Sequence, residues 1–109
     1  MTHPPALRQF LELFNRGEYW ESHEALEPAW QASRSEFYHG LILLASALVH
    51  WQRGNRHGLI SQMAKALRAL EPYAPVHAGI DVGRLVRLGR RMEVPFEIPW
   101  DQDDRTRPT

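Results

Sequence analysis

The sequence of 109 residues contains no cysteine. Disulfides, thiolate zinc sites and cysteine nucleophiles are therefore excluded, and the composition fits a reducing compartment. Long apolar runs are also missing, because the longest run, Leu41 to Val49, is far too short to span a bilayer. The first residues lack the charged and then apolar pattern of a secretion signal. We therefore expect a cytoplasmic protein without a membrane partner.

The sequence also has no excess of positive or negative charge. Thirteen basic residues balance thirteen acidic ones, so no overall field attracts nucleic acid, and we expect no nucleic-acid partner. The sequence also lacks a glycine-rich phosphate loop and the nucleophile elbow of serine hydrolases. Common enzyme classes that depend on these motifs are therefore not indicated.

Apolar residues recur with helical spacing along most of the chain. Leu7, Phe10 and Phe14 lie on one face of a first helix. The most apolar segment covers two adjoining helix faces, which predicts the central and most enclosed helix of a bundle. The first predicted helix ends at Gly17. Four more helices are predicted over residues 19–31, 34–53, 56–71 and 82–92.

Turn signals separate these helices. Ser33 and Glu36 have the spacing of a capping box at the start of the third helix. Gly54 is expected to end that helix in a left-handed conformation, and Asn55 to cap the fourth. Asp81 is the expected N-cap of the fifth. Because the connections are short, neighbouring helices should run antiparallel.

The segment 94–100 contains two prolines, which forbid a helix, and its alternating apolar residues suit an extended strap. Residues 101–109 are charged and lack core material, so we expect this tail to fray. The predicted fold is all-α, a compact antiparallel bundle of about five helices with an extended C-terminal strap. A single domain is expected to cover residues 1–100.

The second helix carries a cluster of ionisable residues. His23 and Glu27 are spaced at i and i+4, and Glu24 follows the histidine, as in the helix motif of zinc hydrolases. In that arrangement His23 and Glu27 would bind a metal, and Glu24 or Glu21 would accept the proton of the attacking water. Because the second ligand is a carboxylate, manganese or iron suits the pattern as well as zinc.

A catalytic metal needs a third protein ligand, for which the third helix offers His39 and His50. If the hairpin between the two helices is centred near Ser33, Glu27 faces the region of His39. His50 lies about 16 Å from His39 along the helix axis, so one ion cannot bind both. His23, Glu27 and His50 would meet only if the helices crossed steeply.

The same residues also have a structural interpretation. His23 and Glu27 can form a half-buried hydrogen-bonded pair that helps to fix the helix packing. His39 and His50 can each place a polar tip at the edge of the core. We interpret the four tryptophans as packing residues, although their density in a small domain also suits a homodimer surface or a pocket wall.

Three stretches of the chain carry a resemblance to a known family: FNRGEYWESHEALE at 14–27, FYHGLI at 37–42 and RGN at 53–55. They look like domain of unknown function family 309, a family of small all-helical proteins. Its members are often labelled predicted metal-dependent hydrolases, so the resemblance implies a divalent metal. The positions that match the motif are Glu21, His23, Glu24, Glu27, Trp30, Gly40, His50 and Asn55. The chain departs from the family at His39 and Leu43, where glutamines are frequent.

Two functions are therefore open. In the first, the protein is a metal-dependent hydrolase that binds zinc or manganese through His23, Glu27 and either His39 or His50. In the alternative, it is a non-enzymatic helical interaction module or a homodimer, and the His/Glu cluster is a structural polar network. The substrate and reaction of the first function are not indicated by the sequence.

Overall fold

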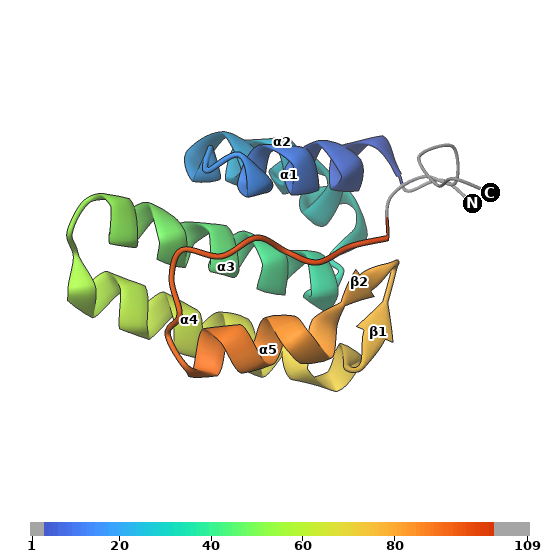
Figure 1. The fold of residues 1–109 in the computed structure, drawn as a ribbon. Coiled ribbons are helices and arrows are strands. Elements are labelled where there is room, and N and C mark those ends of the chain that lie inside the picture. The colour runs from blue at the N-terminus through green and yellow to red at the C-terminus, as the bar shows by residue number, and fades with distance from the viewer. Residues whose placement is uncertain (1–3, 102–109) are drawn as a thin grey trace.

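The structure is a computed structural model that describes residues 4–101. These residues confirm the all-α fold, with five helices, a one-turn 3₁₀ helix and a hairpin of two very short strands (Figure 1). The elements are α1 (Pro5–Asn15), α2 (Tyr19–Ser33), α3 (Glu36–Gln52), α4 (Arg56–Leu70), η1 (Glu71–Tyr73), β1 (Val76–His77), β2 (Ile80–Asp81) and α5 (Val82–Arg90). In this part of the chain no helix has the length and apolar character needed to cross a membrane.

Helix α3 lies at the centre of the bundle, as its apolar faces predict. It packs against both α2 and α4, while α1 packs on α2 and α5 on α4. In Figure 1, α1 and α2 lie above α3, and α4 and α5 lie below it. Nine residues of α3 are buried, because neighbouring helices cover two of its faces.

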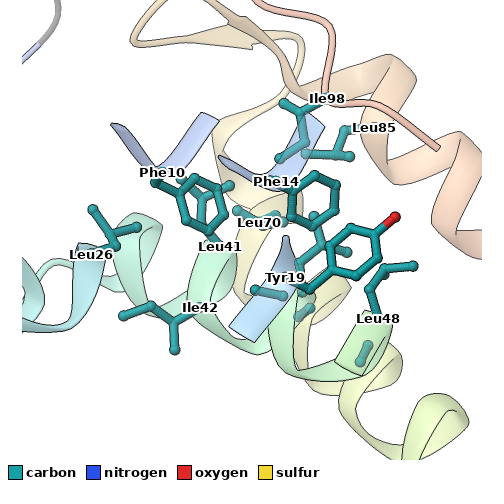
Figure 2. Packing of buried hydrophobic residues seen from close by; sticks show 14 of the residues in the cluster. Phe10, Phe14, Tyr19, Leu26, Leu41, Ile42, Leu48, Leu70, Leu85 and Ile98 are labelled. Atoms are coloured by element: carbon teal, nitrogen blue, oxygen red, sulfur yellow. The ribbon is translucent and has the colours of Figure 1, made fainter. Parts of the chain in front are cut away.

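The core is one apolar cluster to which every helix contributes. From α1 come Phe10 and Phe14, whose ring centroids are 5.8 Å apart, and Tyr19 of α2 packs edge-on against Phe14 at 4.9 Å. Figure 2 shows these rings beside Leu41 of α3 and Leu70 of α4, with the hydroxyl of Tyr19 at the rim of the cluster. Burial of each such side chain contributes roughly 1.5–3 kcal/mol, so this cluster anchors α1 and the start of α2.

Three of the predicted turn signals, Gly54, Asn55 and Asp81, are confirmed. The side chain of Asn55 caps α4 by accepting a hydrogen bond from the backbone N–H of Gly58 at 3.0 Å, and Gly54 before it has a left-handed φ of 73°. The side chain of Asp81 caps α5 by accepting from the N–H of Arg84 at 3.0 Å. These short polar side chains pair backbone donors that a helix start leaves unpaired.

The predicted capping box of Ser33 and Glu36 is wrong. α2 continues to Ser33, whose hydroxyl donates to a carbonyl of its own helix. Arg34 then takes a left-handed conformation with φ of 55°, and Ser35 caps α3 by accepting from the N–H of Tyr38. The turn therefore lies later in the chain than expected, which changes the residues that face each other across α2 and α3.

The strap over residues 94–100 is confirmed as an extended segment. It crosses the bundle in front of α3 in the view of Figure 1, between α1 and α5. Asn15 of α1 fixes it, because the side-chain amide donates to the carbonyl of Ile98 at 3.1 Å and the side-chain oxygen accepts from the Ile98 N–H at 2.7 Å. The charged tail predicted for 101–109 lies outside the described residues, except for Asp101.

Candidate functional site

Helix α2 places its apolar and its ionisable residues on different faces. Tyr19 and Leu26 are buried, and His23 is half-buried at the border. Trp20 lies on the outer face, with 48% of its surface exposed. The expectation that every tryptophan is a packing residue is therefore wrong for Trp20, which follows Tyr19 directly and so points about 100° away from it. It is also wrong for Trp51, near the end of α3, which is 36% exposed.

His23 and Glu27 form the predicted pair within one helix. His23 Nε2 lies 3.5 Å from Glu27 Oε1, and the two side chains are 24% and 35% exposed. Gln31 donates from Nε2 to the other carboxylate oxygen of Glu27 at 3.3 Å. On the other side, the ring of Trp20 stacks on the ring of His23, with centroids 5.2 Å apart and planes within 10°.

The second ring nitrogen of His23, Nδ1, is buried and has no hydrogen-bond partner in the part of the chain that the structure describes. Leaving a buried polar atom unpaired costs about 1–3 kcal/mol. Among residues 4–101, all hydrogen bonds, ion pairs and ring contacts of His23 and Glu27 come from α2 itself. The pair is therefore not the satisfied network between helices that the structural alternative predicts.

The outer face of α2 forms a shallow depression of about 420 Å³ around this pair. Its lining residues all belong to α2 and are Trp20, His23, Glu24, Glu27, Pro28 and Gln31. Of the two predicted catalytic carboxylates, Glu24 lines the depression, whereas Glu21 is exposed about 100° around the helix from Trp20. The site is therefore a surface feature of one helix and not a cleft between helices.

Two contacts give the register of α2 against α3. The ring of Trp30 stacks on His39, with centroids 4.6 Å apart and planes within 12°. At the other end of the hairpin, Gln52 donates from Nε2 to the carbonyl of Gly17 at 2.9 Å. Both pairs are symmetric about the peptide bond that joins residues 34 and 35. Facing residues are therefore displaced by about three positions from the predicted pairs, nearly one helical turn.

His39 consequently does not join Glu27, and the prediction that these residues face each other is wrong. Besides stacking on Trp30, His39 places Nδ1 at 3.9 Å from an oxygen of Glu36. The guanidinium of Arg34 lies over the ring of Trp30, 4.9 Å from its centroid. Sequence reasoning missed this cluster because its assembly depends on where the turn begins.

His50 lies at the corner between α3 and α4, beside the cap of α4. Nδ1 of His50 is 3.1 Å from the side-chain nitrogen of Asn55. Because an amide nitrogen only donates, Nδ1 is the acceptor in this bond. The His50 ring also occupies the space beside Gly58, where an added Cβ would lie 2.6 Å from Cγ of the ring. This histidine therefore has a role in the turn.

Within residues 4–101, no three side chains of the metal-binding types come together as possible ligands. His23 and Glu27 are adjacent, but His39 contacts Trp30 and His50 contacts the corner of α4. A catalytic zinc uses three protein ligands and keeps a fourth position open. The arrangement therefore does not fit the divalent metal that the family resemblance implies.

Residues 7–62, just over half of the chain, match the family described as Domain of unknown function (DUF309). The chain belongs to this family. It is also 37% identical over 93 residues to Uncharacterized protein YpuF of Bacillus subtilis (strain 168), in an alignment that covers 79% of this chain and 53% of that protein. The chain thus spans about half the length of this curated relative.

The DUF309 match runs from α1 into α4 and contains every motif residue named above. Several of these residues serve the architecture of this DUF309 chain. Gly40 permits close approach of α3 to α4, because an added Cβ would lie 2.8 Å from Cγ of Leu70. His50 and Asn55 build the corner between the same two helices. Within residues 4–101, the motif residues His23 and Glu27 have hydrogen bonds, ion pairs and ring contacts only inside α2.

One further residue of this DUF309 chain was not singled out from the sequence. Ser22 is fully buried, and its hydroxyl donates to the carbonyl of Tyr19 at 2.7 Å. Its helical spacing from Tyr19 and Leu26 places it on the buried face, so the signal was present. Burial, and secondly the carboxylate of Glu97, raises the pKa of Tyr19 above its usual value of 10.0.

Proposed function

We propose that this chain is a non-enzymatic interaction module whose outer α2 face binds a partner protein. The observation that supports this most directly is the exposed ring of Trp20, stacked on His23 at the edge of the depression. Tryptophan is enriched among the residues that dominate the free energy of protein interfaces. Trp20 is therefore the central contact of the proposed interface.

The composition of the depression is suited to such a contact. Trp20 and Pro28 supply apolar surface, and Glu24, Glu27 and Gln31 supply polar groups around it. This resembles the pattern of an interface, in which an apolar centre is surrounded by a polar rim. Covering apolar surface stabilises a complex by roughly 25 cal/mol per Å² before the costs of association.

A photo-crosslinking amino acid tests the proposal in the native host. Placed at Gln31 on the rim of the depression, it should form a discrete crosslinked product with a partner. The matched position is Ala64 on α4, which is also exposed but far from this face along the chain. Mass spectrometry of the crosslinked peptide distinguishes a second copy of this chain, the homodimer form of the function, from a different protein.

A variant tests whether the crosslinked product depends on Trp20. Trp20→Ser should abolish the product from Gln31, because it removes the ring but leaves the rim unchanged. The proposal is overturned if Gln31 yields no product, or if Ala64 yields the same product with equal efficiency.

A metal-dependent hydrolase is the competing function. Nδ1 of His23 favours it, because a ring nitrogen without a hydrogen-bond partner keeps its lone pair for a ligand. In that function Glu24 or Glu21 would act as the base. Glu27, however, lies at the other ring nitrogen, Nε2, and neither His39 nor His50 reaches this pair as a third ligand.

Metal addition separates these two functions. We expect the melting temperature of the purified chain to stay unchanged within about 1 °C when zinc or manganese is added, because two adjacent ligands form a weak site. A specific ligand at 100 times its Kd would stabilise the folded state by about 2.7 kcal/mol, which is a shift of several degrees for a chain of this size. A rise of that size that is lost in His23→Ala would favour the hydrolase.

A further inference from the structure

We infer that the partner segment bound by the α2 face is basic, and that one of its arginines stacks on Trp20 and pairs with Glu24 and Glu27. This inference rests on the proposed function and names the chemistry of the partner. It follows from the charge of α2, from the order of its side chains, and from a second tryptophan in the same helix.

Helix α2 contains acidic residues and no arginine or lysine. Its charged side chains are Glu21, Glu24 and Glu27. Glu27 contacts His23 and Gln31, and neither Glu21 nor Glu24 forms an ion pair in the described part of the chain. Because the whole chain has no net charge, this face is a local negative surface that attracts a basic segment.

The order of the side chains suits an arginine. Trp20, Glu24 and Glu27 follow the spacing i, i+4 and i+7, so they lie in one row along the outer side of α2. A guanidinium is flat, stacks on an indole ring and presents a fork of donors that matches a carboxylate. An arginine seated on Trp20 can therefore reach the carboxylates in the next turns of the helix.

Trp30, in the last turns of α2, shows this recognition within the chain itself. Its ring stacks on His39 and also contacts the guanidinium of Arg34, 4.9 Å from the ring centroid. Trp20 has the corresponding histidine stack, on His23. Arg34 stands four residues after Trp30, whereas the residue four positions after Trp20 is Glu24. No arginine or lysine of residues 4–101 contacts the ring of Trp20, so this part of the chain leaves the place of the cation to a partner.

The partner inferred here is a different protein and not a second copy. A symmetric contact between two α2 faces would bring like carboxylates together, which is destabilising. The exposed arginines Arg84 and Arg87 of α5 could supply the cation. Because α2 and α5 lie on opposite sides of α3 (Figure 1), two copies cannot form both reciprocal α2–α5 contacts at once, and a single such contact is heterologous. Such a contact propagates into rings or filaments, so it does not give a defined dimer.

Hexaarginine is the probe for this inference, with hexacitrulline as the neutral peptide of nearly the same shape. The readout is NMR of the four tryptophan indole N–H groups, in which the Trp20 signal is assigned by its loss in Trp20→Leu. We expect hexaarginine to shift the Trp20 signal in a saturable manner and hexacitrulline to leave it unchanged. A carboxylate contact of this kind is worth about a three- to tenfold change in affinity, which is the loss expected for Glu24→Gln, measured from the Trp20 signal that this variant keeps.

Glu21→Gln is the matched control, because it removes the same charge from the same helix outside the depression. Its affinity should stay within about twofold of the wild type. The inference is overturned if hexacitrulline binds equally well, if hexaarginine causes no saturable shift, or if Glu21→Gln and Glu24→Gln weaken binding equally. It is also overturned if light scattering shows a self-associated species that both Trp20→Leu and Glu24→Gln dissolve.

This outcome is distinguishable from failure of the proposed function. Crosslinking from Gln31 without hexaarginine binding would leave the α2 face as a docking surface and remove only the basic chemistry of the partner. Absence of the crosslink would remove the docking surface itself.

Discussion

Asn55 uses both ends of its side-chain amide at the corner between α3 and α4. Its oxygen accepts the N–H of Gly58, which fixes the orientation of the amide, and its nitrogen donates to Nδ1 of His50. Because that lone pair is used, Nε2 is the ring nitrogen that carries the proton in the neutral imidazole. His50, which the sequence presents as a possible metal ligand, therefore stabilises the turn between α3 and α4.

Gly58→Ala tests the packing of this corner. The new methyl group would lie 2.6 Å from Cγ of the His50 ring, so the ring has to move and its bond to Asn55 is lost. We expect the free energy of unfolding, measured by urea denaturation, to fall by about 1–3 kcal/mol. In a His50→Ala background the same change should be neutral or stabilising, because alanine is a better helix former than glycine. Equal losses in both backgrounds would contradict this account.

Tyr19 links stability to alkaline pH. Burial, followed by the carboxylate of Glu97, raises its pKa above 10.0, so folding favours the neutral phenol. Its contribution is complete below pH 10.0, the unfolded-state pKa, and is lost as the pH rises through the higher folded-state pKa. We expect the unfolding free energy of the wild type to fall more steeply in that range than that of Tyr19→Phe. Simultaneous titration of all three tyrosines in the ultraviolet absorbance would argue against the raised pKa.

The hairpin of α2 and α3 shows why the fold could be predicted from the sequence and much of the site could not. Periodicity indicates which face of a helix is buried, and this alone places α3 at the centre. Which side chains meet across a hairpin depends on the position of the turn. When the centre of the turn shifts by about one and a half residues, the residue that faces a given position on the other helix changes by about three. For this reason His39 faces Trp30 and not Glu27. Strands of two residues, such as β1 and β2, are too short to show a period.

The position of this turn can be tested by comparing two serines. Ser35→Ala removes the acceptor for the Tyr38 N–H at the start of α3, and we expect it to lower the unfolding free energy by about 1 kcal/mol. Ser33→Ala is the matched control, because its hydroxyl donates to the Ala29 carbonyl within α2 and accepts the N–H of Ser35, and both of these bonds are exposed to water, so the loss should be less than about 0.5 kcal/mol. A larger loss for Ser33→Ala would restore the capping box that the sequence predicts.

At the scale of the whole molecule, the strap joins the two ends of the described chain. Ile98 is buried in the core, and both of its backbone hydrogen-bonding groups bind the side chain of Asn15, which is 83 positions away. The neighbouring carbonyl of Pro99 accepts the N–H of Asp81, at the end of the short hairpin. The strap therefore ties α1 to the segment that precedes α5, and α1 and α5 lie on opposite sides of α3 (Figure 1).

Asn15→Ala should release the strap without unfolding the bundle. It leaves two backbone groups of Ile98 unpaired, and at about 0.5–1.5 kcal/mol for each bond the unfolding free energy should fall by roughly 1–3 kcal/mol. Hydrogen exchange locates the effect, because the amide of Ile98 should exchange much faster while that of Leu44, in the middle of α3, keeps its protection. Gln52→Ala is the control, since it removes one exposed bond between α3 and the start of α2. If Ile98 stays protected in Asn15→Ala, the strap is held by its apolar contacts alone, and the two hydrogen bonds set only its direction.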